Sequence, residues 1–189
     1  MKLKIACNNW PEMYPEQPET EVELTRTDER LCIRYSVHGR QLRAMATEDQ
    51  QPVWEDSCVE FFCRQQGDTY YMNFETNCIG TMVASKRKGR AVDVVPLKSE
   101  EMAQIVRRSS LKREQIEEKD GVFDWWVEIE IPFTLLLGGR QPEFPLTLEA
   151  NFYKCADGTR YPHYLSWQPI DLPKPDFHCP QFFRNLVIE

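Results

Sequence analysis

The sequence predicts an all-β fold: a two-sheet antiparallel β-sandwich of the jelly-roll or immunoglobulin-like kind, with one or two short helices. Three observations favour it. Apolar residues recur mainly with a period of two, turn residues separate short runs, and the 13 prolines gather near the two ends, where they mark loops. We expect one domain, residues 1–189, since single domains commonly have about 100–200 residues.

Seven segments are predicted to be strands, because each alternates apolar and polar residues or is rich in β-branched and aromatic ones. They are VELTRT (22–27), LCIRYSV (31–37), VEFFCR (59–64), YYMNFETN (70–77), GTMVAS (80–85), WWVEIEI (125–131) and LTLEANFYK (146–154). DER at 28–30 and QGD at 66–68 are predicted hairpin turns, so the strands that flank each turn should pair antiparallel.

Helical signals are few. SEEMAQIVRR (99–108) begins with a serine cap and two acids and ends with two arginines, which predicts a short helix. PFTLLLGG (132–139) predicts a single helical turn closed by glycine. The segment between them, 109–121, has no clear apolar stripe and is interpreted as a charged connection that leads into a strand.

The charge balance limits the partners of the chain. Its net charge is −7, from 30 acids and 23 bases, and phosphate binding favours a basic face, so we expect no nucleic-acid partner. The one basic cluster, SKRKGR (85–90), is interpreted as a solvated turn. No stretch approaches the roughly 20 apolar residues of a membrane helix, so we expect no membrane partner.

The seven cysteines are odd in number and form no CxxC motif, which argues against a zinc site or a disulfide framework. Several lie at apolar strand positions, and buried free thiols favour a reducing compartment. The apolar run at the N-terminus is too short for a signal peptide. We therefore predict a cytoplasmic location, with export left open if a leader has been removed.

Polar side chains recur on the outward faces of several predicted strands, because residues two apart share a face. They are Glu60, Asn73, Glu75, Asn77, Glu149, Asn151 and Tyr153. A solvated sheet face accounts for Glu128 and Glu130, but less well for a stripe that mixes carboxylates, amides and aromatics. Trp54 and Trp167 lie in predicted loops, and indoles with a polar rim suit the apolar faces and hydroxyls of a sugar ring.

A series of motifs, in order along the chain, resembles carbohydrate-binding module family 9 and related DOMON-like sandwich domains. The motifs are WEDSCVEFF (54–62), YMNFETN (71–77), WVEIEIPFTLL (126–136), LEANFYKC (148–155), LSWQP (165–169) and FHCPQFFRNLVI (177–188). The resemblance implies a β-sandwich that binds sugars without cleaving them. It also implies that a glycan's reducing end is held between two tryptophans, which match Trp54 and Trp167 by motif position.

The resemblance also assigns polar residues to a mono- or oligosaccharide. Glu60 matches a glutamate that binds sugar hydroxyls, Asn77 matches an amide of the ligand strand, and Asn151 lies in a strand that supplies polar groups. Glu75 stands where some members carry an arginine. No cofactor is expected, although family members can bind calcium, for which the acidic loop 48–56 is the candidate here.

Three other functions stay open at this point. Glu60 and Glu75 could be the carboxyl pair of a glycoside-processing enzyme. A haem or metal could use the three histidines, which are His38, in a predicted hairpin turn, His163 and His178. The same fold could also be a protein-interaction module. The sequence does not indicate an oligomeric state.

Overall fold

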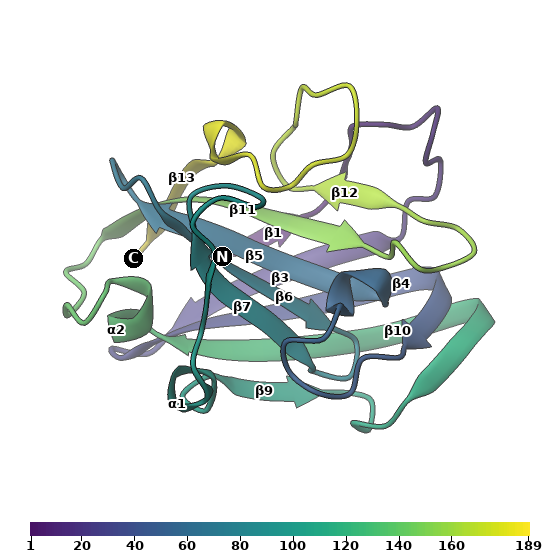
Figure 1. Cartoon of the computed structure of the whole chain (residues 1–189), viewed down its shortest axis with the longest axis horizontal. Coiled ribbons are helices and arrows are strands. Elements are labelled where there is room, and N and C mark those ends of the chain that lie inside the picture. The colour runs from purple at the N-terminus through teal and green to yellow at the C-terminus, as the bar shows by residue number, and fades with distance from the viewer.

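The structure, a computed structural model, describes residues 1–189 as two antiparallel β-sheets packed face to face (Figure 1). This confirms the predicted all-β sandwich with two short helices. The helices are α1 (Ser99–Met102) and α2 (Phe133–Leu136), and two 3₁₀ turns are η1 (Val53–Glu55) and η2 (Pro180–Phe182). The structure contains no helix long and hydrophobic enough to span a lipid bilayer.

The first sheet has five strands. In spatial order they are β1 (Lys2–Lys4), β3 (Glu19–Arg26), β4 (Arg30–Ala44), β10 (Ile116–Pro132) and β9 (Val106–Ser109). The second sheet has eight strands. Seven of them lie in the order β2 (Cys7–Asn8), β12 (Tyr164–Ser166), β11 (Leu146–Cys155), β5 (Cys58–Gln65), β6 (Tyr71–Asn77), β7 (Met82–Arg87) and β8 (Val95–Pro96), and β13 (Arg184–Ile188) pairs with β11.

All seven predicted strands are present, and both predicted hairpins pair antiparallel, β3 with β4 and β5 with β6. Two local predictions are wrong. Helix α1 ends at Met102, and the rest of the predicted helix includes β9, whose residues pair with β10. His38 lies inside β4, opposite Asp124, because β4 continues through Gly39 to Ala44 instead of turning.

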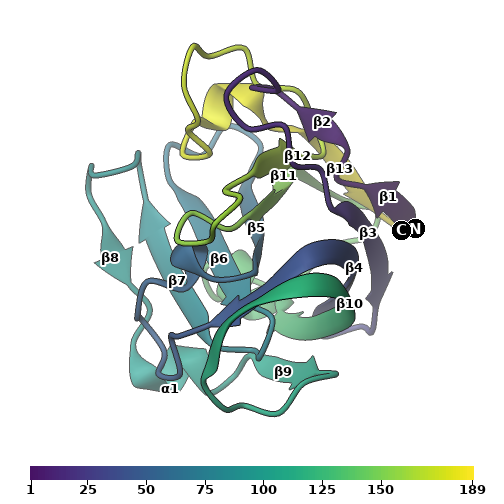
Figure 2. The same ribbon diagram turned by 90° about the vertical axis from the view of Figure 1, so that its right-hand side faces the viewer.

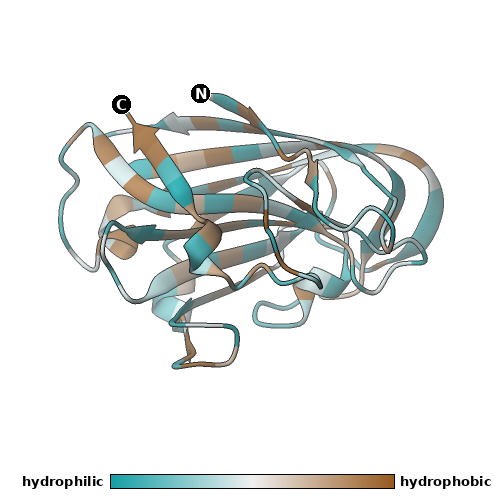
Figure 3. Cartoon of the chain, turned by 90° about the horizontal axis from the view of Figure 1, so that it is seen from above, coloured by the Kyte–Doolittle hydropathy of each residue, from teal (hydrophilic) through white to brown (hydrophobic).

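The period-two pattern places one side of each sheet in the core between the layers. Apolar and polar residues alternate along the strands, as the bands of Figure 3 show. The inward residues of β5 and β6, among them Val59, Phe61 and Phe74, are completely buried. They pack with inward residues of β4 and β10, such as Tyr35 and Val127, in one large cluster.

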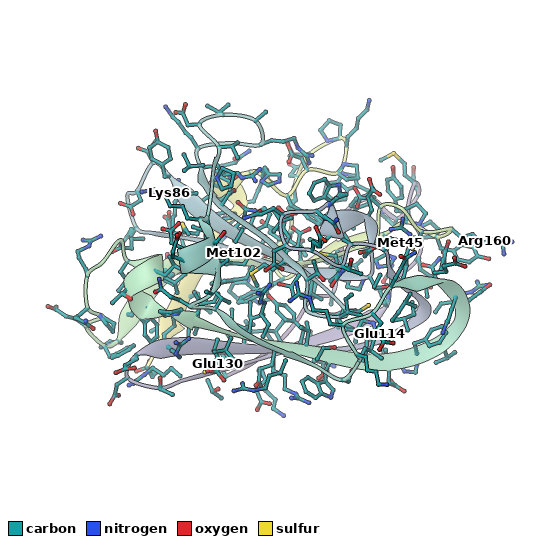
Figure 4. All side chains as sticks on the ribbon, turned by 60° about the horizontal axis from the view of Figure 1, so that its bottom comes forward. Met45, Lys86, Met102, Glu114, Glu130 and Arg160 are labelled. Atoms are coloured by element: carbon teal, nitrogen blue, oxygen red, sulfur yellow. The ribbon has the colours of Figure 1, made fainter.

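The outer face of the eight-stranded sheet is also buried. The segment after β2 and the segment between β12 and β13 lie over it (Figures 1 and 2). Trp10, Ile170, Phe177 and Phe183 from these segments pack on Phe62 and its neighbours in a second apolar cluster. The expected solvated face is therefore found only on the five-stranded sheet. There, Glu128 and Glu130 of β10 contact the exposed Arg108; Figure 4 labels Glu130 at the margin of the molecule.

Candidate functional site

A cavity of about 510 Å³ lies where the covering segments leave part of the outer sheet face free. Its lining from the strands comprises Glu60 of β5, Glu75 of β6, Arg87 of β7 and Cys155 of β11. The remaining lining residues come from turns, strand β12 and the covering segments. They are Tyr14, Trp54, Arg90, Asp157, Tyr164, Lys174, Pro175, Asp176, Phe177 and His178.

The strand side of the cavity holds two carboxyl groups as direct cross-strand neighbours. Glu60 and Glu75 are paired in the β5–β6 register, and both are almost fully buried, at 3% and 4% exposed. Side chains of directly opposed residues have Cβ atoms about 4.5–5.5 Å apart, so two negative charges here repel strongly. Burial raises the pKa of Glu60 well above its ordinary value, and the nearby Glu75 adds to this shift.

Burial likewise raises the pKa of Glu75, to about 7, although Arg87 acts against the shift. A series of hydrogen bonds connects Arg87 to Glu75. Arg87 Nε donates to Ser85 Oγ at 2.8 Å, Ser85 Oγ donates to Asn73 Oδ1 at 2.5 Å, and Asn73 Nδ2 donates to Glu75 Oε1 at 2.8 Å. The raised pKa values of Glu60 and Glu75 favour a bound proton on this carboxyl pair near neutral pH. The strands and the hydrogen bonds fix the orientation of the Glu75 carboxyl group.

Arg87 brings a buried guanidinium to the same cavity. The residue is 9% exposed, and besides its bond to Ser85 it donates from Nη1 to the carbonyl of Arg90 at 3.0 Å. No carboxylate lies within ion-pair distance, and Nη2 has no hydrogen-bond partner in the protein. A buried arginine with an unused donor beside a cavity is ready to bond a ligand.

His178 completes this polar group as a neutral side chain. Burial, together with Arg87 and Arg90, lowers the pKa of its imidazole to about 3. Its Nδ1 lies 2.9 Å from Tyr71 Oη, and its Nε2 lies 4.0 Å from Glu75 Oε1. The three histidines do not come together, because His38 contacts Asp124 and His163 contacts Lys154. The arrangement gives no histidine cluster for haem or metal.

Trp54 supplies the exposed aromatic surface of the cavity. It lies in the 3₁₀ turn η1 and is 39% exposed, the largest value among the tryptophans. A second turn holds η1 in place, since the backbone N–H of Asp157 donates to the Trp54 carbonyl at 3.0 Å and that of Gly158 donates to the Glu55 carbonyl at 3.0 Å. A Cβ atom at Gly158 would lie 2.9 Å from that Glu55 oxygen, so this close approach requires glycine.

The expected slot between Trp54 and Trp167 is not present. Trp167 is half-buried and packs edge-on against Phe152, with ring centroids 5.7 Å apart, at the border of the core between the sheets. Its backbone N–H bonds the Phe152 carbonyl, which turns the indole to the inner side of β11 and away from the cavity. The aromatic side chains that do share the cavity with Trp54 include Tyr14 and Tyr164.

Asn77 and Asn151 are also absent from the cavity lining, which corrects their expected contact with a ligand. Asn77 is fully buried; it donates to the Ala46 carbonyl and to Asp56, and it accepts from two backbone N–H groups. Asn151 bonds the backbone of Gln168 in both directions. Both N–H donors and the oxygen of Asn77 are used inside the protein, and the Asn151 oxygen accepts from two backbone N–H groups, so both amides serve to fix loops.

In the acidic loop 48–56, the candidate for calcium, two carboxylates are engaged by donors of the protein. Asp49 accepts from Arg107 at 2.6 Å and from Arg113 at 2.9 Å. Asp56 accepts from Arg43, from Asn77 and from two backbone N–H groups. Calcium needs six to eight oxygen ligands, and protein donors already engage both oxygens of Asp56 and Oδ1 of Asp49.

Several cavity residues were not predicted from the sequence. Arg87 and Arg90 belong to the basic cluster 85–90, which was interpreted as a solvated turn. Extending the alternation of Val83 and Ser85 by one step would have placed Arg87 on the outer face with Glu75. The expectation still holds for Lys86, which points elsewhere and is exposed (Figure 4). No sequence pattern indicated Tyr14, Tyr164 or Asp157, which come from irregular segments or from the short strand β12.

A β-sandwich whose sheet carries a polar cavity with an aromatic edge has the architecture of a ligand-binding module. The chain belongs to carbohydrate-binding family 9, whose family model matches residues 1–188. None of the curated protein sequences compared with the chain matches it.

Solved structures agree with this assignment. The chain is 35% identical to a protein from Bacteroides uniformis ATCC 8492, to which carbohydrate binding has been provisionally ascribed; the match covers 100% of this chain and 86% of that one, with a TM-score of 0.93. A family 9 module from Caldicellulosiruptor kristjanssonii shares the fold at 13% identity. Its glucose complex gives a TM-score of 0.58 over 92% of this chain and 78% of that one, and its cellotriose complex gives 0.60 over 92% and 76%.

Proposed function

We propose that the chain binds a mono- or oligosaccharide in the cavity described above and does not cleave it. The observation that carries the proposal is the joint presence in one cavity of an exposed indole, a buried carboxyl pair and the Arg87 guanidinium, which makes no ion pair. Membership of carbohydrate-binding family 9 supports it, as do the glucose and cellotriose complexes of the related fold.

The indole of Trp54 offers a flat apolar surface for one face of a pyranose ring. Stacking removes apolar area from water, which contributes about 25 cal/mol per Å² before costs. Tyr14 and Tyr164 line the same cavity and provide further aromatic surface, in the role that the resemblance assigned to Trp167. The aromatic contact of this chain is thus one tryptophan with tyrosines, where two tryptophans were expected.

The polar side of the cavity complements sugar hydroxyls, which both donate and accept. Glu60 and Glu75 offer acceptor oxygens, and Arg87 offers the donor that some family members carry at the position of Glu75. Hydrogen bonds to charged groups contribute about 1.5–3 kcal/mol each in favourable settings. Lost translational freedom and desolvation offset much of this gain, so we expect dissociation constants between micromolar and millimolar.

The carboxyl pair is also the observation that favours the second candidate, a glycoside-processing enzyme. A glycosidase places its acid and its base or nucleophile on either side of the scissile bond. Glu60 and Glu75 instead lie on adjacent strands on the same side of the cavity, so both would face the same edge of a ligand. We therefore expect no turnover of aryl glycosides; turnover that Glu60→Gln abolishes would establish the enzyme instead.

Replacing Trp54 with alanine is expected to weaken sugar binding at least tenfold, about 1.4 kcal/mol, because the stacking surface is lost. Isothermal titration calorimetry with glucose, xylose, cellobiose and cellotriose measures this. Trp126→Ala is the matched control, since that indole lies under Arg34 on the five-stranded sheet, and it should leave binding unchanged. No heat with any sugar, from protein that is folded by circular dichroism, would contradict the proposal and favour a protein-interaction module.

We further propose that the chain works in a reducing compartment and that sugar binding needs no calcium. Support for the first comes from the seven cysteines, all of which are free thiols. Support for the second comes from the protein donors that already engage Asp49 and Asp56 in loop 48–56. Sugar titrations with and without a calcium chelator should give the same affinity.

A further inference from the structure

Two thiols and one carboxyl group converge beside the cavity. Cys58 and Glu60 are two residues apart on β5 and share its outer face, and Cys155 lies directly opposite Cys58 on β11. The two sulfur atoms and a Glu60 oxygen all lie within 4.8 Å of one another, and Cys155 Sγ is 3.1 Å from Glu60 Oε1. All three side chains are held on hydrogen-bonded strands in the interior of the sheet.

We propose that Cys58, Glu60 and Cys155 form a binding site for Zn²⁺, with a fourth coordination position open to the cavity. Zinc prefers thiolate and carboxylate ligands in a tetrahedron, at about 2.3 Å from sulfur and 2.0–2.2 Å from oxygen. Those bond lengths separate neighbouring ligand atoms by about 3.5–3.8 Å. The donors of this cluster are already close to that spacing, so an ion could enter with side-chain adjustments alone.

No sequence motif indicates this site, because its ligands do not follow the short spacings of zinc motifs. Two strands bring together residues that are 95 positions apart. Access comes from the cavity, which Glu60 and Cys155 line, while Cys58 is completely buried behind them. Cys63, by contrast, lies in the core between the sheets and has no such access.

The charge of the surroundings also favours an anionic metal cluster. Lys154 is buried, at 2% exposed, and makes no ion pair; its Nζ donates to the Cys155 carbonyl and to His163 Nε2, each at 2.8 Å. Burial lowers the pKa of Lys154, and the groups that act against this shift are Cys155, Cys58, Cys78 and Glu60. Zinc with two thiolates and one carboxylate carries one negative charge, which would balance that of Lys154.

Binding would exchange protons for the metal. Burial raises the pKa of Cys58 to about 11, and burial also raises the pKa of Cys155, so both thiols are protonated in the metal-free chain. Two S–H bonds are replaced by two Zn–S bonds, and Glu60 gives up its proton where it carries one. Two to three protons are released for each ion, and affinity should therefore rise steeply with pH.

The test uses the reduced, chelator-treated full chain. Titration with Co²⁺, a spectroscopic substitute for Zn²⁺, should give one equivalent of a tetrahedral species with sulfur-to-metal charge-transfer bands, which Zn²⁺ then displaces. Cys58→Ser and Cys155→Ser should each lower the affinity by more than about 100-fold. Cys32→Ser is the matched control, since it also leaves six thiols but lies on the five-stranded sheet, and it should bind as the wild type does.

A measurement on the wild-type chain covers the case in which a serine variant does not fold. Zn²⁺ should protect Cys155 from alkylation by iodoacetamide while Cys32 reacts at an unchanged rate, as mass spectrometry of peptides would report. The proposal is overturned by the absence of one-equivalent binding, by equal losses in all three serine variants, or by unprotected Cys155. Sugar titrations on the same sample keep the outcome separate from that of the sugar proposal.

Discussion

Replacing Asp56 with alanine is expected to lower the free energy of unfolding by about 3–5 kcal/mol, because one buried carboxylate holds four donors. Asp56 Oδ1 accepts from Arg43 Nη1 at 2.6 Å and from the Met45 N–H at 2.8 Å, and Oδ2 accepts from the Ala46 N–H at 3.0 Å and from Asn77 Nδ2 at 2.9 Å. Without the carboxylate these donors lose their partner in a region closed to water. Urea denaturation followed by tryptophan fluorescence measures the change.

Glu55→Ala is the matched control for this experiment. Glu55 also approaches Arg43, but at 4.0 Å and with about half of its side chain exposed, so its removal should cost less than about 1 kcal/mol. A similar small effect at Asp56 would contradict the role given to that carboxylate. It would mean that water reaches the donors once the acid is gone.

Replacing Glu75 with glutamine is expected to remove a pH-dependent loss of stability. Burial raises the pKa of Glu75 from 4.5 to about 7, so the folded chain binds this proton more tightly than the unfolded chain does. The stability that the proton contributes is complete below pH 4.5 and is lost as the pH rises through about 7. Glutamine stays neutral, so over this window the variant should gain up to about 3 kcal/mol relative to the wild type.

The measurement is the difference in unfolding free energy between the two chains at several pH values from 4 to about 8.5, by urea denaturation. Glu143→Gln, at an exposed position, supplies the background for the loss of one acid. Parallel curves for Glu75→Gln and the wild type would show that the carboxyl pair is ionised in the folded chain. The inference that Glu75 is protonated near neutral pH would then be wrong.

The strands could be predicted from the sequence because one physical rule, the alternation of faces, decides them. The inward set of Val59, Phe61 and Phe74 and the turns at 28–30 and 66–68 all follow from local patterns. The same rule put Glu60 and Glu75 on one face, and the structure brings them into one cavity.

What lies above that face could not be predicted in the same way. The covering segments contain Pro11, Pro15, Pro173 and Pro175 and have no period, so nothing local states which sheet they will lie on. Burial of the outer face, and with it the raised pKa of Glu75, depends on this long-range packing. Trp167 was misplaced for the same reason, since a loop position does not tell which side of the neighbouring strand an indole will take.

The division of the cavity between strands and irregular segments has an evolutionary consequence. Residues on β5, β6 and β7 are tied to the ladder that holds the sheet together, so exchanging them risks the fold itself. The turn around Trp54 and the proline-bounded segment that carries Lys174 can change in sequence with little loss of stability. Relatives can therefore inherit one recognition chemistry and diverge in which molecules they admit.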